Sequence, residues 1–223
     1  MRWARTAGLW AAGLIVALGA AGCSARAQAA RPVTYVAIGA SDAVGVGARD
    51  PVTEGWVPRL GAHLGSEARV INLGVSGSTL AQALDEQLGP ALDAQPDVVT
   101  VWLAVNDLNA RVSLEHYAAD LDRLLGRLEA SHARVLVGNV PDLGGLAAYR
   151  GIDPGPLKAE VDRWNRVVAD TTSRHGDTLV DLYSLWQEVA QHPEYLSADG
   201  FHPSSEGYQA LADVFGAVLD ARS

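Results

Sequence analysis

The stretch Val33-Thr-Tyr-Val-Ala-Ile-Gly39-Ala-Ser41-Asp42 places a hydroxyl side chain directly behind a run of β-branched and other apolar residues. An apolar run of this kind, which ends in glycine and lacks the alternation of a half-exposed strand, predicts a buried strand of a parallel sheet. In such sheets, ligands bind beyond the carboxyl ends of the strands. The position of Ser41 just after the strand therefore places its hydroxyl where a binding site is expected.

The rest of the chain alternates strand and helix patterns. Further strands are predicted at Val70 to Leu73, Val98 to Leu103, Arg134 to Val140 and Thr178 to Leu182. Helices are predicted at Trp56 to Leu64, Leu80 to Leu88, Ser113 (as N-cap) to about Ala130, Pro156 to about His175, and Ser204 to about Leu219. This alternation predicts an α/β fold, a three-layer α/β/α sandwich with about five parallel strands, in one domain over residues 32–223.

Polar residues and glycine follow the other predicted strands. Gly74 follows the second strand, Asn106 the third and Asp142 the fourth, so that all should lie at one edge of the sheet. We expect Asp42, Asp107 and Asp142 to fall near the mouth of a site at this edge. Trp56, Trp102, Trp164 and Trp186 occupy apolar faces and are expected in the core.

Asp199-Gly-Phe-His202 puts a carboxylate three residues before an imidazole. A serine hydroxyl becomes a good nucleophile when a neutral histidine, oriented by a carboxylate, takes its proton. On its own, His202 is better explained as a loop histidine that precedes a proline and caps the last helix. Together with Asp199 and Ser41, it favours nucleophilic catalysis with Ser41 as nucleophile, His202 as base and Asp199 as the acid that orients the base.

Attack on an ester carbonyl creates an oxyanion, which needs hydrogen-bond donors already in place. Gly74 offers a backbone N–H without a side chain in the way, Asn106 offers a side-chain amide, and the N–H of Ser41 would be the third donor. Gly74 and Asn106 can also be explained as turn residues. Their appearance after consecutive strands favours an oxyanion hole.

Four short blocks of this chain resemble those of the SGNH hydrolase superfamily, also called GDSL esterases/lipases. The blocks are Gly39-Ala-Ser41-Asp42, Asn72-Leu-Gly74, Ala104-Val-Asn106-Asp107 and Asp199-Gly-Phe-His202-Pro203. The resemblance covers roughly residues 32 to 220. It implies a flavodoxin-like fold, a catalytic triad of Ser41, His202 and Asp199, and an oxyanion hole made by Ser41, Gly74 and Asn106.

Two positions depart from the usual pattern of that superfamily. Ala40 stands where the first block usually has Asp, and Ala104 stands where the third block usually starts with Gly. Neither change removes a catalytic atom. Ala40 lacks a carboxylate beside the nucleophile, and Ala104 narrows the space behind Asn106.

The residues and the resemblance together predict an extracytoplasmic serine esterase that forms an acyl-enzyme on Ser41. Its substrates would be small-molecule, lipid or glycan acyl esters, of the lipase/esterase, deacetylase or lysophospholipase type. Two alternatives stay open. One is an acyltransferase that uses the same site, and the other is a non-catalytic envelope binding protein on the same fold.

Residues 1–23 are typical of an export leader. Arg2 and Arg5 precede the uncharged apolar run Leu9 to Ala21, and small residues precede Cys23, the single cysteine. The segment resembles a bacterial lipoprotein signal, with Ala20 where Leu is usual, and the resemblance implies lipidation of Cys23. Cleavage after Ala27 is the alternative. We expect residues 24–31 to be a tether and the protein to lie in the cell envelope, anchored on the outer side of a membrane through this lipid. The alternative is a secreted or periplasmic protein.

Composition and motif spacing weigh against three further kinds of ligand. The formal net charge of −9 and a single lysine, Lys158, weigh against binding of nucleic acid. The histidines other than His202 are scattered without metal-ligand spacing, and Gly45-Val-Gly47 is too short for a dinucleotide fingerprint. We therefore expect neither a metal nor a cofactor.

Overall fold

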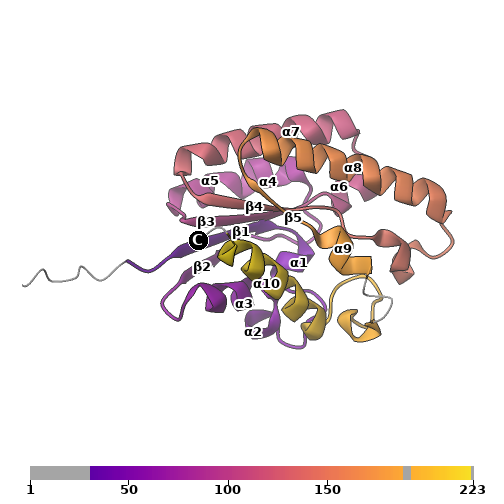
Figure 1. Ribbon diagram of the computed structural model, residues 1–223, viewed down its shortest axis with the longest axis horizontal. Coiled ribbons are helices and arrows are strands. Elements are labelled where there is room, and N and C mark those ends of the chain that lie inside the picture. The colour runs from indigo at the N-terminus through magenta and orange to yellow at the C-terminus, as the bar shows by residue number, and fades with distance from the viewer. Residues whose placement is uncertain (1–30, 188–191, 222–223) are drawn as a thin grey trace, which may run out of the picture. The chain divides into compact units, whose positions relative to one another are not determined.

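A sheet of five parallel strands, in the order β2-β1-β3-β4-β5, lies at the centre of the computed structural model, which describes residues 31–187 and 192–221 (Figure 1). The strands are β1 (Thr34–Gly39), β2 (Arg69–Asn72), β3 (Val98–Trp102), β4 (Arg134–Gly138) and β5 (Thr178–Val180). The inner strands β1 and β3 are buried over their whole length, whereas the edge strand β2 is largely exposed. The predicted α/β fold with about five parallel strands is confirmed.

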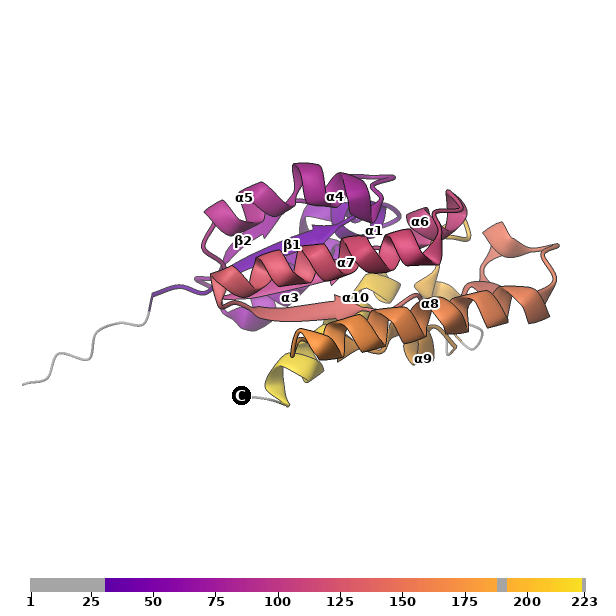
Figure 2. The same ribbon diagram turned by 90° about the horizontal axis from the view of Figure 1, so that it is seen from above.

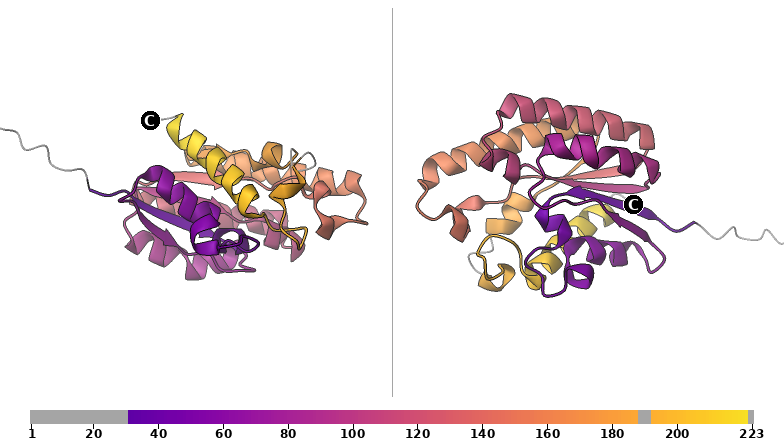
Figure 3. Two further views of the ribbon diagram at one scale, coloured as in Figure 1. Left: turned by 90° about the horizontal axis from the view of Figure 1, so that it is seen from below. Right: turned by 180° about the vertical axis from the view of Figure 1, so that it is seen from behind.

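Helices cover both faces of the sheet (Figure 1). One face carries α1 (Ser41–Val44), α2 (Pro51–Glu54), α3 (Trp56–Leu64) and α10 (Ser205–Asp220), and the other carries α4 (Leu80–Glu86), α5 (Leu88–Asp93), α6 (Val105–Asn109), α7 (Leu114–Leu128) and α8 (Pro154–Arg174). The long helices α7 and α8 run side by side (Figure 2). Helix α10 packs against α3, although the two helices are far apart in the sequence (Figure 3). A short helix, α9 (Leu182–Gln187), follows β5.

Aromatic pairs fill the space between each helix layer and the sheet. Trp56 stacks on Phe215 with ring centroids 4.7 Å apart and joins α3 to α10. On the opposite face, Tyr117 and Trp164 join α7 to α8 at 4.6 Å. All four rings are at most 2% exposed, so their burial contributes a large share of the hydrophobic stabilisation of the domain.

The predicted element boundaries hold to within about two residues, with one clear exception. The helix predicted at Leu80 to Leu88 is two helices, α4 and α5, which meet at Gln87. Pro90 explains the break, because proline has no N–H to donate to the carbonyl of Glu86 in the preceding turn. The predicted N-cap at Ser113 is confirmed, since its hydroxyl accepts a hydrogen bond from the N–H of His116 at 3.2 Å.

The predicted export leader, Cys23, the alternative cleavage after Ala27 and the tether up to residue 30 lie outside the described residues and stay predictions. Within the described ranges, no helix is both long enough and apolar enough to cross a membrane.

His175, which is not part of the predicted site, joins the C-terminal ends of α7 and α8. Its Nδ1 lies 2.6 Å from Glu129 Oε1 and its Nε2 lies 3.1 Å from Asp122 Oδ1. Burial of the ring works to lower its pKa, but the hydrogen bonds to Glu129 and Asp122 outweigh burial and raise the pKa above its ordinary value. The folded state therefore favours the protonated ring.

We predict that His175→Ala destabilises the protein in a pH-dependent way. Because the pKa of His175 is raised on folding, its contribution is fully present below the unfolded value of about 6.5 and is lost as the pH rises through the folded value. The variant should lose about 1 kcal/mol of unfolding free energy at pH 5.5, an amount typical of half-exposed ion pairs. Urea unfolding of both proteins at pH 5.5 and pH 9 measures the difference.

The matched control places His175→Ala in a background that carries Asp122→Asn and Glu129→Gln. In that background only burial acts on the ring and lowers its pKa, so the difference should no longer be larger at pH 5.5 than at pH 9. A difference that stays constant from pH 5.5 to pH 9 in the otherwise wild-type chain contradicts the assignment.

Candidate active site

Ser41, His202 and Asp199 form a continuous line of hydrogen bonds at the carboxyl edge of the sheet. Ser41 is the first residue of α1, directly behind β1, and His202 lies in the loop that leads into α10. His202 Nε2 lies 2.9 Å from Ser41 Oγ, and His202 Nδ1 lies 2.7 Å from Asp199 Oδ2. The structure thus brings together the three side chains that the sequence singles out, although Ser41 and His202 are 161 positions apart.

Asp199 is held as an acceptor by several donors. Its Oδ1 accepts hydrogen bonds from the backbone N–H groups of Phe201 and His202 at 2.8 and 2.9 Å, and from the Ser197 hydroxyl at 2.8 Å. Burial works to raise the pKa of Asp199, but the hydrogen bonds from His202 and these donors outweigh burial and hold the pKa well below its ordinary value. Asp199 is therefore ionised at any working pH and fixes the orientation of the His202 ring.

The loop after α1 and the loop before α10 are clamped to each other. Tyr208 donates from its hydroxyl to the carbonyl of Val46 at 2.6 Å, and Arg49 donates its backbone N–H to the Ser205 hydroxyl at 3.0 Å. Gly47, with φ +97°, lies so close to the carbonyl of Pro203 that a Cβ at this position would collide with it. This close contact fixes the loop of His202 relative to the helix of Ser41.

Gln87 supports the end of β1 from inside the protein. Its side-chain amide accepts from the N–H of Gly39 and donates to the carbonyl of Gly39, both at 3.0 Å, and also donates to Ser78 Oγ at 3.2 Å. The amide thus completes the backbone hydrogen bonds two residues before Ser41. Nothing in the sequence singles out Gln87, because a glutamine within an apparent helix gives no signal that its side chain points inward.

Of the three expected oxyanion donors, Asn106 and Gly74 differ in whether their N–H groups are free to bind an oxyanion. Asn106 lies in α6 beside Ser41 and uses one amide N–H to bond the carbonyl of Ser78 at 2.9 Å, which leaves its second N–H for a ligand. Gly74 packs against α1, where a Cβ would come within 2.7 Å of Ala43 Cβ. Its N–H donates to Asn72 Oδ1 at 3.0 Å, so an oxyanion would compete with Asn72 for this donor.

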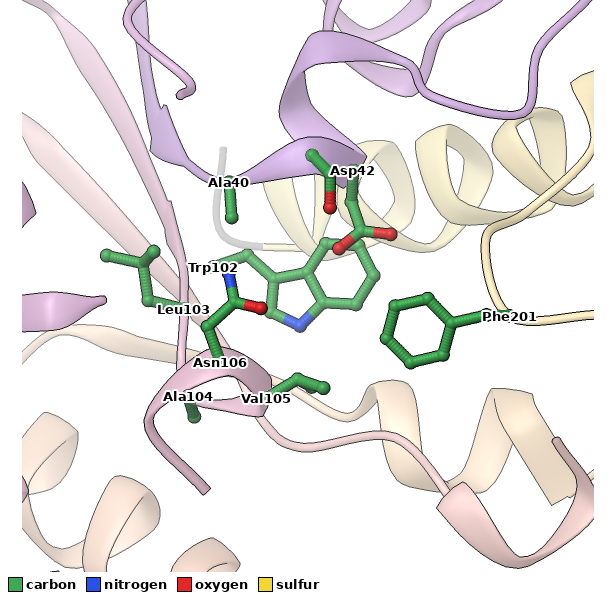
Figure 4. A pocket seen from close by; sticks show the side chains of 9 residues that line it. Ala40, Asp42, Trp102, Leu103, Ala104, Val105, Asn106 and Phe201 are labelled. Carbon is green, nitrogen blue, oxygen red and sulfur yellow. The ribbon is translucent and has the colours of Figure 1, made fainter. Parts of the chain in front are cut away.

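A hollow beside Ser41, here called the nucleophile pocket, lies between the carboxyl ends of β1 and β3 (Figure 4). It encloses about 310 Å³ including its open mouth, and its lining is Ala40, Ser41, Asp42, Trp102, Leu103, Ala104, Val105, Asn106 and Phe201. The strand order 2-1-3-4-5 reverses direction between β1 and β3, and crevices at such reversals bind ligands in open α/β sheets.

A second hollow, here called the side pocket, adjoins the first. It measures about 300 Å³ including its mouth and shares Asp42, Trp102, Val105 and Phe201 with the nucleophile pocket. Its remaining lining is Pro141, Leu143, Leu146, Trp186 and Pro203. Trp102 and Trp186 are core residues, as expected, but each also forms a pocket wall, a role that the sequence analysis did not assign to them.

The three aspartates expected at the site mouth lie in different environments. Asp42 lines both hollows together with Trp102 and Phe201. Burial raises the pKa of Asp42 to about 6, against the opposing effect of His202. The expectation for Asp107 is wrong: it is 1% exposed and accepts from the N–H of Leu80, because it caps α4. Asp142 caps the turn Leu143–Gly145 and lines a separate groove.

Ala104 adopts a backbone conformation that favours glycine. Its φ is +120° and its ψ is −39°, and its side chain is buried between β3 and α6. The carbonyl of Ala104 accepts from the N–H of Leu108 at 2.8 Å and so starts the helix that carries Asn106. The alanine that stands in place of the usual glycine at position 104 is therefore a strained residue close to the oxyanion donor Asn106.

Comparisons with known proteins agree with the α/β fold and point to ester hydrolysis. The model of the GDSL-like Lipase/Acylhydrolase family matches residues 37–210. An acetylxylan esterase of Geobacillus stearothermophilus is 25% identical over 154 residues, which cover 66% of this chain and 70% of the relative. The spore germination lipase LipC of Bacillus licheniformis is 26% identical over 205 residues, which cover 82% of this chain and 95% of LipC. The crystal structure of TesA matches with a TM-score of 0.70 at 24% identity, over 83% of this chain and 97% of TesA.

We predict that Ala104→Gly stabilises the protein. Relief of the positive φ at residue 104 should raise the free energy of unfolding by about 1–3 kcal/mol. The extra conformational freedom of glycine in the unfolded chain should lower it by about 1 kcal/mol. The net gain in unfolding free energy should be about 1 kcal/mol, measured by chemical denaturation.

The control is Ala119→Gly on the exposed face of α7. The same chemical change at this helical position should cost about 1 kcal/mol. Equal destabilisation by the two substitutions would show that Ala104 carries no strain.

Proposed function

The chain belongs to the GDSL-like lipase/acylhydrolase family and is a carboxylic ester hydrolase, and we propose that it cleaves acyl esters through an acyl-enzyme on Ser41. The observation that carries this proposal is the line of hydrogen bonds from Asp199 through His202 to Ser41, at 2.7 and 2.9 Å. A serine in such a line can lose its proton to the imidazole as it attacks.

The proposed reaction has two halves. First, Ser41 Oγ bonds to the acyl carbon while its proton passes to His202 Nε2, and that proton then moves to the leaving alcohol as the ester C–O bond breaks. Next, a water molecule gives a proton to His202 while its oxygen bonds to the acyl carbon, and the acid leaves as Ser41 regains its proton. Asp199, ionised throughout, stabilises the imidazolium formed in each half.

Oxyanion stabilisation is assigned to the free N–H of Asn106 and the backbone N–H of Ser41. As the first residue of α1, Ser41 has a backbone N–H without an acceptor inside the helix. Gly74 would join them once Asn72 releases its N–H. The free N–H groups of Asn106 and Ser41, with the N–H of Gly74 as a third donor, are sufficient to stabilise the oxyanion of a tetrahedral intermediate on Ser41.

We assign short acyl groups, such as acetyl, as substrates. The nucleophile pocket is small and closed by Trp102, Leu103 and Phe201, which leaves little room for a long chain. The likeness to an acetylxylan esterase supports the same class. The likeness to a lipase favours longer chains, so a series of chain lengths distinguishes the two.

Replacing Ser41 by alanine should abolish the reaction. We expect wild type to hydrolyse 4-nitrophenyl acetate faster than the laurate ester, and to be labelled by a fluorophosphonate. Loss of the nucleophile should lower kcat by at least about 10⁴-fold, since triad members act as a unit. Initial rates and mass spectrometry of the labelled protein measure both effects.

Asn106→Ala is the control in the same assay, because it removes one oxyanion donor and leaves the nucleophile in place. It should keep fluorophosphonate labelling of Ser41 but lose about 10²–10³-fold in kcat, the usual cost of one oxyanion donor. Hydrolysis at equal rates by wild type and Ser41→Ala would exclude Ser41 as the nucleophile.

We also propose that the protein is exported and held on the outer side of a membrane through a lipid on Cys23. The support comes from the sequence alone, in the charged start, the uncharged apolar run and the small residues before Cys23. This location would give the enzyme access to lipid or glycan esters of the cell envelope.

Cys23→Ser should release the protein from the membrane. When the full chain is expressed in a bacterial host, wild type should partition into detergent and carry the mass of a lipid, and the variant should do neither. If the mature wild-type chain instead begins after Ala27, the segment is an ordinary secretory signal and the lipid anchor on Cys23 is excluded.

A further inference from the structure

Gln87 is a buried polar residue whose hydrogen bonds lead both toward the nucleophile and toward an oxyanion donor. It lies where α4 meets α5 and is 2% exposed. Its Oε1 accepts from the N–H of Gly39, and its Nε2 donates to the carbonyl of Gly39, both at 3.0 Å. Nε2 also donates to Ser78 Oγ at 3.2 Å. The two N–H groups and the carbonyl of this amide therefore all have partners.

The partners of Gln87 determine how its amide is oriented. The N–H of Gly39 needs an acceptor, so the amide oxygen must face it, and the amide nitrogen then faces the carbonyl of Gly39. Gly39 is the last residue of β1 and lies two positions before Ser41. Gln87 thus pairs with the end of the strand that carries the nucleophile, beyond the point where β2 ends at Asn72.

Ser78 continues the connection to Asn106. Its carbonyl accepts from the side-chain N–H of Asn106 at 2.9 Å, and Ser78 itself is 3% exposed. The amide of Asn106 is planar, so a hydrogen bond from one N–H fixes the direction of the other, which is the N–H assigned to the oxyanion. The contacts Gly39–Gln87–Ser78–Asn106 are here called the amide relay.

Strand pairing by itself leaves a gap between the nucleophile and this donor. The pairing of β1 with β3 ends at Gly39 and Trp102, four residues before Asn106. Ala104 lies between Trp102 and Asn106, and its φ of +120° is a conformation that persists only when surrounding contacts hold it. The amide relay connects the end of β1 to Asn106 without passing through the strained residue.

We propose that Gln87 is a positioning residue that sets the oxyanion donor Asn106 against the nucleophile Ser41. The proposal rests on the function proposed above and adds to it a residue outside the lining of both hollows. The oxyanion forms only as the ester carbonyl is attacked, so a displaced donor slows the chemical steps and leaves substrate binding in place. A displacement of about 1 Å can cost about 10²-fold in rate.

Gln87→Met removes the amide and keeps the length of the side chain. In this variant the carbonyl of Gly39 keeps its bond from the N–H of Val75 at 3.2 Å, while the N–H of Gly39 and the Ser78 hydroxyl lose Gln87. For each active site titrated with a fluorophosphonate, kcat on 4-nitrophenyl acetate should fall about 10- to 100-fold, and KM should change less than about threefold.

A double-mutant cycle with Asn106→Ala distinguishes positioning from a general effect on the fold. When the donor is absent, Gln87 has nothing to position, so Gln87→Met should lower kcat by less than about threefold in the Asn106→Ala protein. A residue that only stabilises the fold would give equal losses in the two backgrounds. Equal losses, or an unchanged kcat in Gln87→Met alone, overturn the proposal.

Tyr35→Phe is the matched control, since it removes another buried hydrogen bond made by β1 and its neighbour. The hydroxyl of Tyr35 lies 2.9 Å from Thr100 Oγ1, and both residues are 0% exposed. Tyr35 lies four positions before Gly39, away from the carboxyl end of the strand. This variant should lose stability and keep the kcat of wild type.

Ser78→Ala carries the test if Gln87→Met does not fold. It interrupts the amide relay but leaves both hydrogen bonds between Gln87 and Gly39 in place. It should lower kcat about 3- to 10-fold in the wild-type background and have no further effect in the Asn106→Ala protein. An unchanged kcat in Ser78→Ala contradicts the relay.

A measurement without turnover separates this proposal from the proposed function. In NMR spectra of ¹⁵N-labelled protein, the side-chain amide of Asn106 is the signal that Asn106→Ala removes. It should move in Gln87→Met and stay in place in Tyr35→Phe, and a signal that does not move in Gln87→Met overturns the relay. A wild type that cleaves no ester, yet shows this movement, overturns the catalytic proposal and leaves Gln87 as the residue that positions Asn106.

Discussion

The reversal of strand order between β1 and β3 is the constraint on which the site depends. Parallel strands need crossover connections, and these are almost always right-handed. From β1 the chain crosses to β2 through α3 on one face, and then returns past β1 to β3 through α4 and α5 on the other face. No connection therefore covers the carboxyl ends of β1 and β3, and the first residues after these strands, Ser41 and Asn106 among them, face one crevice. The helices and the loop of His202 are arranged around a space that the winding of the sheet leaves open.

Much of the fold is visible in the sequence, because the inner strands are short apolar runs and the long helices have regular apolar spacing and clear caps. Ser113 before α7 is an example. The short helices α1, α2, α6 and α9 have at most six described residues, too few for a periodic pattern, and the sequence analysis did not find them. The triad side chains could be chosen by residue type and order. Gln87, the pocket roles of Trp102 and Trp186 and the burial of Asp107 could not, because each depends on which surface the side chain meets after folding.

At the site, hydrogen bonds hold the catalytic groups firmly in place, while neighbouring residues keep strained or poorly solvated conformations. Asp199 is surrounded by donors, and Gln87 fixes the backbone before Ser41. At the same site Ala104 keeps a positive φ, and desolvation raises the pKa of Asp42 to about 6. Strain and unpaired polar groups persist where the surrounding structure over-determines them, and they gather at functional sites. In this protein Ala104 and Asp42 both line the nucleophile pocket, which a substrate would fill.

The clamp between the loop after α1 and the start of α10 has a consequence for how activity arises during synthesis. Tyr208 and Ser205 hold the nucleophile loop from within the last helix, and His202 lies just before that helix. A ribosome makes the serine early and the histidine near the finish, so an incomplete nascent chain contains a hydroxyl that nothing can activate. Hydrolysis can begin only when α10 has docked, so a nascent chain that still lacks this helix is a latent enzyme that cannot damage the esters around it.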